Sequence, residues 1–143
     1  MIYFTLAELK RTTTGLPNEP GDAEIENLVN LVKHVLDPLR ELAGSPISVN
    51  SGYRSAAVNA AVGGSKTSDH MKGLAADIVV GPKPRVWLTG WGPERLARVI
   101  AESDLPFDQV IWEPTWVHVS WRWSPRRQVL KKVGSDYAIW SPS

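Results

Sequence analysis

Apolar residues in the first third of the chain recur at the spacing of a helix. Between residues 22 and 43 they form one stripe with the 3.6-residue period of an amphipathic helix: Ile25, Leu28, Val29, Val32, Val35, Leu36, Leu39 and Leu42. We expect a long helix here, with Asp22 as its N-cap and Gly44 at its end. Because proline removes a backbone hydrogen bond and clashes with the preceding turn, Asp37-Pro38 should kink or locally break this helix. Shorter helices are predicted at Thr5-Leu6-Ala7-Glu8 from its capping-box spacing, at 59–64, and at 93–102, where Pro93 suits the first helical position.

Alternating apolar and polar positions replace the helical period in the later part of the chain. They predict strands at 47–50, 74–80, 107–113 and 116–123, with an edge strand at 128–133. Only Pro114-Thr115 separates two of these strands, which predicts an antiparallel hairpin. Helices that come first and strands that mostly follow indicate an α+β fold, with N-terminal helices packed on a small antiparallel sheet. The segment 81–92, with two prolines, is expected to be an exposed loop.

The composition limits the classes of protein to which the chain can belong. A chain of 143 residues predicts a single domain spanning 1–143, and we favour a monomer. The net charge of +1 gives no strong field for nucleic acid or an anionic membrane, and no nucleic-acid-binding motif is present. No apolar run approaches the ~20 residues of a membrane span, and the first residues lack a signal-peptide pattern, so we expect synthesis in the cytoplasm. The absence of cysteine excludes thiolate metal sites and disulfides.

Any histidine-based metal site must therefore use His34, His70 or His118. Strand alternation places His118 away from the valine-rich face, and His70 precedes the strand that contains Asp77. Two imidazoles and one carboxylate form the ligand set of a catalytic zinc site that leaves one position for water. On the residues alone, His118 as an ordinary polar residue and Asp77 as a strand-end cap or ion-pair partner stay open. His34, on a helix beside Lys33, is expected to be solvent-exposed and without a metal role.

A set of spaced motifs bears on the choice between a metal site and these ordinary roles of His118 and Asp77. The chain contains SGYRS at 51–55, then Asn59, Gly63-Gly64, the pattern S-x-H-x-x-G-x-A-x-D-I at 68–78, and WVHVS at 116–120. From about residue 28 to 130 it resembles the zinc D-Ala-D-Ala carboxypeptidase-like peptidases, which have the Hedgehog/DD-peptidase fold and are often phage-associated. The resemblance implies one Zn²⁺ held by His70, Asp77 and His118. It also implies hydrolysis of peptidoglycan peptides by metal-activated water, as a carboxypeptidase or a cross-peptide endopeptidase, at the cell wall by a phage lysis or tail route.

Glu113 is the candidate general base. If the predicted hairpin pairs Glu113 with Trp116, then His118 faces Ile111 and Glu113 lies diagonal to it, with Cα atoms ~7–8 Å apart. That gap suits a water molecule between metal and base. The better-known relatives place the acid three residues before the last ligand, where this chain has Thr115. Asp69 and Asp108 therefore remain alternatives, and Glu113 as an exposed residue at a hairpin tip is another interpretation.

Further residues are assigned around the site. The resemblance implies that Arg54 binds substrate or stabilises the oxyanion, although an ion pair within a loop is the alternative. Ser68 is predicted to orient a ligand or to be a turn residue, Tyr53 to contact substrate or only to pack, and Trp116 to form a wall of the site. Of the other tryptophans, we expect Trp121 and Trp123 in the core, and Trp87 and Trp91 in a lid or a packed loop. A basic cluster is interpreted as a solvated face: Arg122, Arg126, Arg127, Lys131 and Lys132.

The sequence thus predicts a zinc metallopeptidase that acts on peptidoglycan. The alternative is a non-catalytic, zinc-containing binding or assembly domain of the same fold.

Overall fold

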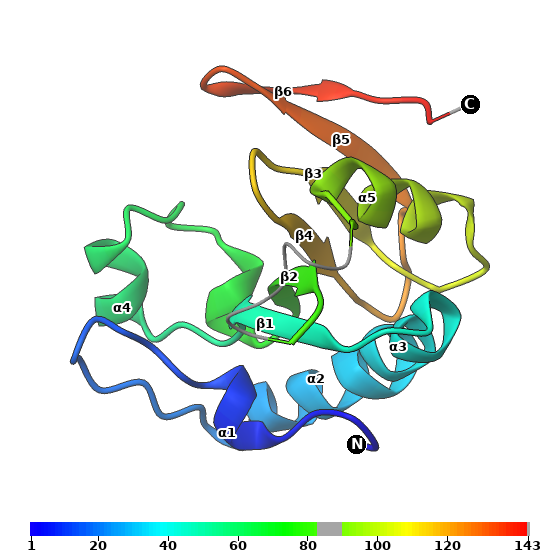
Figure 1. Ribbon diagram of the computed structural model, residues 1–143. Coiled ribbons are helices and arrows are strands. Elements are labelled where there is room, and N and C mark those ends of the chain that lie inside the picture. Colours follow the sequence, from blue (N-terminus) through cyan, green and yellow to red (C-terminus); the bar gives the residue numbers. More distant parts are fainter. Residues whose placement is uncertain (83–89, 143) are drawn as a thin grey trace.

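A six-stranded sheet with helices against it organises the chain (Figure 1). The computed structural model describes residues 1–82 and 90–142. The strands, in the sheet order β1-β2-β4-β3-β5-β6, are β1 Ile47–Ser51, β2 Ala75–Val80, β4 Val117–Ser120, β3 Gln109–Trp112, β5 Gln128–Val133 and β6 Asp136–Ile139. The helical segments are α1 Leu6–Leu9, α2 Asp22–Leu31, the π-helical η1 Val32–Leu36, α3 Asp37–Ala43, α4 Ala56–Ala61, the 3₁₀ turn η2 Asp69–Lys72 and α5 Pro93–Glu102. The α+β class expected from the order of the elements is confirmed.

The long N-terminal helix runs from α2 through η1 into α3. Its predicted break takes the form of a wider π-helical turn just before Pro38, which then lies in the first turn of α3. Gly44 ends the helix in a left-handed conformation with φ of 64°, as expected. The predicted N-cap was wrong by one residue: Gly21 has the extended cap conformation and Asp22 begins the helix. The helix expected at 59–64 begins earlier, because Ser55 caps α4 by accepting a hydrogen bond from the Val58 N–H.

The β3–β4 hairpin has the predicted antiparallel register. Ile111 pairs with His118, and the Glu113 N–H donates to the Trp116 carbonyl at 3.1 Å. Asp77 of β2 pairs with His118 from the other side, so Ile111, His118 and Asp77 lie in one row across three strands. Strand alternation therefore places these three side chains and Glu113 on the same face of the sheet.

The prediction of an antiparallel sheet was wrong for β5, which runs parallel to β3. The reason is a return of the chain after β4. The buried Asp108 carboxylate, just before β3, accepts hydrogen bonds from the Arg126 backbone and guanidinium, and the Asp108 carbonyl accepts one from the Gln128 N–H. Because both strands then start at the same end of the sheet, β5 must run parallel to β3. Nor is β5 the edge strand, since β6, which the sequence analysis missed, pairs antiparallel with it.

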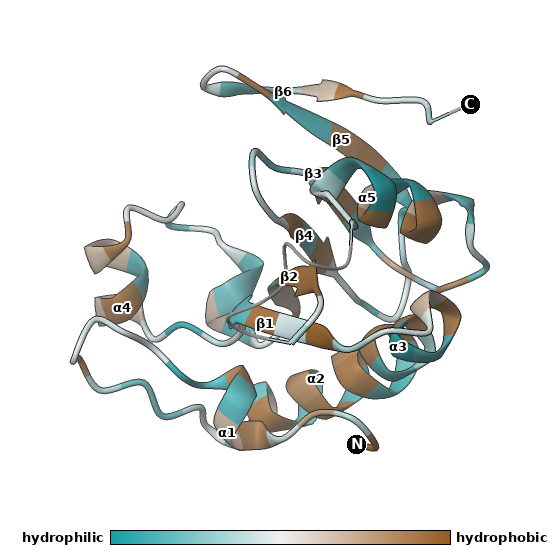
Figure 2. Ribbon diagram, in the orientation of Figure 1, coloured by the Kyte–Doolittle hydropathy of each residue, from teal (hydrophilic) through white to brown (hydrophobic). Residues whose placement is uncertain are grey.

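The core lies between the sheet and the helices. Hydrophobic residues concentrate on α2, α3 and the strands nearest to them (Figure 2), and α5 packs on β2, β3 and β4. Buried members of this cluster include Leu28, Val35, Leu39, Ile78, Val110, Val117 and Val119. In the described part of the chain, no helix has both the length and the apolarity needed to cross a membrane.

The aromatic residues at the end of β4 correct two predictions. Trp121 is buried, as expected, but Trp123 is 75% exposed because β4 ends at Ser120 and its alternation does not continue. His34 is half-buried rather than solvent-exposed: its ring stacks on Trp121 with centroids 5.0 Å apart. Trp91 is half-buried, with the Arg95 guanidinium 4.0 Å above its ring, whereas Trp87 lies outside the described residues.

Candidate metal centre

Three separate elements bring His70, Asp77 and His118 together. His70 lies in η2, Asp77 in β2 and His118 in β4, directly opposite Asp77. The Ser68 hydroxyl accepts a hydrogen bond from the His70 N–H at 3.2 Å, so it caps η2 and positions the backbone that carries the imidazole. Gly73 ends η2 in a left-handed conformation with φ of 74°, which lets β2 begin immediately afterwards.

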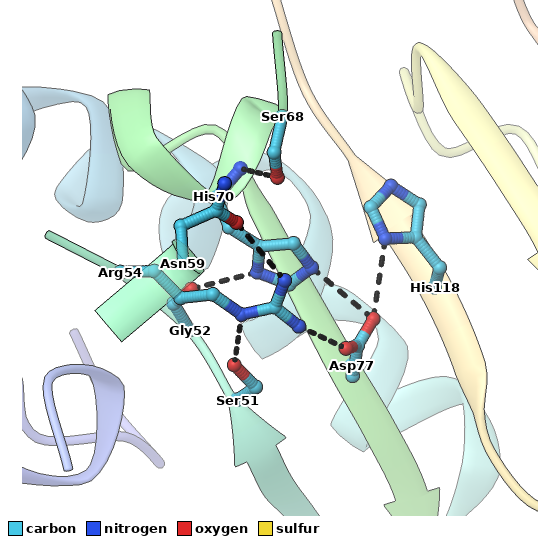
Figure 3. Close-up of polar contacts among 8 residues, drawn as sticks. All are labelled: Ser51, Gly52, Arg54, Asn59, Ser68, His70, Asp77 and His118. Atoms are coloured by element: carbon cyan, nitrogen blue, oxygen red, sulfur yellow. Dashed lines mark hydrogen bonds and ion pairs between the residues drawn. The ribbon is translucent and has the colours of Figure 1, made fainter. Parts of the chain in front are cut away.

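The two imidazoles converge on one carboxylate oxygen (Figure 3). His70 Nε2 lies 3.3 Å and His118 Nδ1 3.2 Å from Asp77 Oδ1. One ligand atom from each of the three residues lies within 4.8 Å of the others. His70 and Asp77 are buried and His118 is half-buried, so His118 is the most accessible member of the group. Two ring nitrogens and a carboxylate oxygen fit a borderline divalent cation such as zinc.

Backbone and arginine contacts orient these donors. His70 Nδ1 lies 2.7 Å from the Gly52 carbonyl oxygen, which can only accept a hydrogen bond. Nδ1 therefore carries a proton, and Nε2 is the nitrogen that faces Asp77 and His118, where it can bind a metal ion once its own proton is released. Arg54 donates to Asp77 Oδ2 at 3.1 Å and leaves Oδ1 to the histidines.

The electrostatics keep Asp77 ionised. Burial acts to raise the pKa of Asp77, but hydrogen bonds from His118 and His70, together with their charge, outweigh it and hold that pKa well below its usual range. The site therefore presents an anionic oxygen, which a metal cation requires.

Arg54 forms hydrogen bonds with several other residues of the chain. Its guanidinium also donates to Ser51 Oγ at 2.9 Å and to Asn59 Oδ1 at 3.4 Å. Arg54 does form an ion pair, as the alternative held, but its partner is Asp77 of β2 and not a residue of the same loop. A role of Arg54 toward substrate stays a prediction.

Glu113 lies at the end of β3 on the same face as His118, where the predicted register places it. Its side chain is buried, not exposed at a hairpin tip, and within the described residues its carboxylate has neither a hydrogen bond nor an ion pair. Burial raises the pKa of Glu113, and the charge of Asp77 raises it further, while His118 and Lys132 act to lower it. A carboxylate with a raised pKa suits a group that accepts and returns a proton near neutral pH.

The two alternative bases are held by arginines. Asp108 is fully buried and bound to Arg126, with Arg122 Nε 3.0 Å away. Asp69 pairs with Arg122 at 3.3 Å. Each is already neutralised by a cation, which favours Glu113 as the proton carrier.

A cleft of about 530 Å³ opens over the metal-ligand group. Its lining includes the three candidate ligands, Arg54, Ser68, Glu113 and Trp116. Tyr53 is not part of this lining; its side chain packs in the core, as the alternative interpretation held. β5 and β6 also contribute Leu130, Lys132 and Tyr137 to the cleft. Leu130 and Tyr137 were not predicted as site residues, and the expectation that Lys132 belongs to a solvated face was wrong, because it is half-buried in this lining. The alternation at 128–133 predicted the strand itself. Which of its residues line the cleft depends on the pairing of β5 with β3, which the alternation does not indicate.

Comparison with known proteins agrees with this geometry. Residues 2–120 match the Peptidase M15 family, a range that contains all three candidate ligands and Glu113. The chain is 39% identical over 84 residues to the zinc D-Ala-D-Ala carboxypeptidase of Streptomyces albus G, a match that covers 56% of this chain and 32% of that protein. The chain thus spans about a third of the length of this curated relative. On the family match, which covers most of its length, the chain belongs to the peptidase M15 family.

Proposed function

We propose that the protein is a zinc-dependent metallopeptidase that hydrolyses peptide bonds of bacterial peptidoglycan at the cell wall. The convergence of His70, Asp77 and His118 on one point, with Glu113 on the same sheet face, carries the proposal. Membership of a peptidase family supports it, and so does the similarity to a zinc D-Ala-D-Ala carboxypeptidase. The bond cut is that of a C-terminal D-alanine or of a peptide cross-link.

The residues of the cleft have separate roles in the proposed reaction. His70, Asp77 and His118 would hold the zinc ion, which would supply the Lewis acidity that polarises a scissile carbonyl and lowers the pKa of a water molecule. The Glu113 carboxylate accepts the proton of the attacking water and delivers it to the leaving amine nitrogen. Arg54 fixes the Asp77 carboxylate, and Trp116 gives the peptide an aromatic wall.

Hydrolysis of defined fragments tests this function. Purified protein is incubated with peptidoglycan peptides with and without zinc, and mass spectrometry identifies the new termini. We expect cleavage that stops after chelation and returns with zinc. Loss of a terminal D-alanine identifies a carboxypeptidase, and separation of cross-linked peptides identifies an endopeptidase. Full activity after exhaustive metal removal contradicts the proposal.

The substitution Glu113→Gln tests the proton carrier. Because general acid–base groups contribute typically 10²- to 10⁴-fold, we expect kcat to fall by about that factor while the zinc content stays at one ion per chain. Glu26→Gln, an exposed change on α2, is the matched control and should keep full activity. Unchanged hydrolysis by Glu113→Gln refutes the role of Glu113. Wall binding without turnover by either the wild type or the variant supports a non-catalytic zinc domain instead.

A further inference from the structure

The C-terminal hairpin β5–β6 forms one wall of the cleft, and it lies beyond the residues that match the peptidase family. Leu130 of β5 pairs with Ile111 of β3, and Lys131 pairs with Trp112. The next residue along β5, Lys132, therefore lies beside Glu113 and, by strand alternation, on the same face as Leu130. Lys132 in turn pairs with Tyr137 of β6. The cleft thus gains a lysine and a tyrosine next to the candidate base.

The charges in the cleft leave Lys132 available. Arg54 is paired with Asp77, and Asp69 with Arg122. Lys132 has no ion pair with any residue that the structure describes. Its ammonium lies 4.2 Å from the centre of the Tyr137 ring, and its contact with the Ser135 carbonyl, at 3.5 Å, is at the outer limit of a hydrogen bond. This half-buried ammonium acts on the neighbouring Glu113 only through its charge and forms no ion pair with a carboxylate of the described residues, so it can bind an anionic group of a ligand.

We propose that Lys132, held in place by Tyr137, binds a carboxylate of the peptide substrate, so that the cleft selects acidic peptides. This rests on the proposed function. Neighbouring strands lie about 4.8 Å apart, so β5 is about 10 Å from His118 on β4, across β3. An extended peptide covers about 3.3 Å per residue. The carboxylate that Lys132 binds therefore belongs about two to three residues from the scissile bond.

Peptide pairs that differ only in one carboxylate test this subsite. In each pair, a wall-type peptide that ends in D-alanine carries either a free carboxylate or its carboxamide at a chosen distance from the scissile bond. A charge-assisted hydrogen bond predicts that amidation at the recognised position raises KM about tenfold or more for the wild type. Lys132→Gln should raise KM for the acidic peptide by a similar factor and change KM for the amidated peptide less than twofold.

Lys131→Gln is the matched control. Lys131 precedes Lys132 on β5, but its ammonium lies over Trp112 at 4.4 Å on the opposite face, and it does not line the cleft. It should leave KM for both peptides unchanged. Equal effects of the two lysine substitutions overturn the proposal, since they indicate a general charge effect. A loss of kcat on both peptides with a shifted pH profile in Lys132→Gln also overturns it, because Lys132 then acts through Glu113.

Affinity measurements distinguish a failure of this inference from a failure of the proposed function. If the zinc-loaded wild type cleaves none of the peptides, the proposed function fails, and calorimetry on the same protein still compares their affinities. A preference for the acidic peptide that is absent in Lys132→Gln supports the subsite. Equal affinity for both peptides overturns it.

Discussion

Asp77 shows how one side chain organises the site at the scale of a single residue. One of its oxygens meets both imidazoles and the other meets Arg54, so a buried carboxylate remains ionised. The trio itself could be predicted from sequence because spaced motifs carried all three members. The contact between His70 Nδ1 and the Gly52 carbonyl could not be predicted, because every residue has a backbone carbonyl and the residue type does not indicate which one accepts the hydrogen bond.

Asp108 carries a pH-dependent part of the stability. Its burial acts to raise its pKa, but hydrogen bonds from Arg126 and the charges of Arg122 and Arg126 outweigh this and hold the pKa below its usual range. A carboxyl whose pKa is lower in the folded state stabilises the fold above its unfolded pKa of about 3.9, and this contribution is lost as the pH falls through the folded value. We therefore expect Asp108→Asn to lower the free energy of unfolding by about 1–3 kcal/mol at pH 7.

Urea unfolding at pH 7 and at pH 3 measures this effect. The difference in the free energy of unfolding between wild type and Asp108→Asn should shrink at pH 3, where the wild-type carboxylate begins to be protonated. Asp104→Asn, an exposed change a few residues earlier, should alter stability little at either pH. A difference of the same size at both pH values contradicts the role of the Asp108 charge.

At the scale of elements, local patterns were predictable and long-range pairings were not. The stripe from Ile25 to Leu42 marked the long helix, and the short Pro114-Thr115 connection fixed the β3–β4 register, which in turn placed Glu113 beside His118. The parallel pairing of β5 depends on Asp108 binding Arg126, residues 18 positions apart in separate segments. Without knowledge of that contact, the sequence does not indicate whether β5 runs parallel or antiparallel to β3. The residues that β5 contributes to the cleft were therefore not predicted.

Gly73 joins η2 to β2 in a space that admits no side chain. Its φ of 74° is left-handed, and a Cβ atom there would lie 2.4 Å from the Glu24 carbonyl oxygen of α2. Gly44 has a similar φ of 64° but open space around it. We expect Gly73→Ala to reduce the free energy of unfolding by more than about 2 kcal/mol, because backbone strain and steric overlap add, and Gly44→Ala by only about 1 kcal/mol.

Chemical denaturation of the two glycine variants measures this difference, and zinc titration of Gly73→Ala shows whether η2 still places His70. Because the strain lies one turn from His70, the zinc affinity of Gly73→Ala should fall, whereas that of Gly44→Ala should not. Equal losses of stability in both variants would mean that the contact with α2 is relieved at no cost.

At the scale of the whole molecule, the site joins three separate elements that only the folded chain brings to one point. His70 follows α4 in η2, Asp77 lies in β2, and His118 lies in β4 after α5 and β3. Unfolding separates them, so an ion bound to all three is bound to the folded state. Ligand binding of this kind stabilises a protein in proportion to the logarithm of free ligand over Kd.

Zinc should therefore raise the thermal stability of the protein and not only its activity. At free zinc 100-fold above Kd, the expected gain is about 2.7 kcal/mol in the free energy of unfolding, seen by calorimetry as a higher Tm that falls back after chelation. His118→Ala should abolish the shift because it removes a ligand. His34→Ala should lower the Tm by removing the stack on Trp121 but keep the zinc shift, since His34 lies outside the ligand group. A zinc shift of full size in His118→Ala would remove His118 from the ligand set, and loss of the shift in His34→Ala alone would place the ion elsewhere.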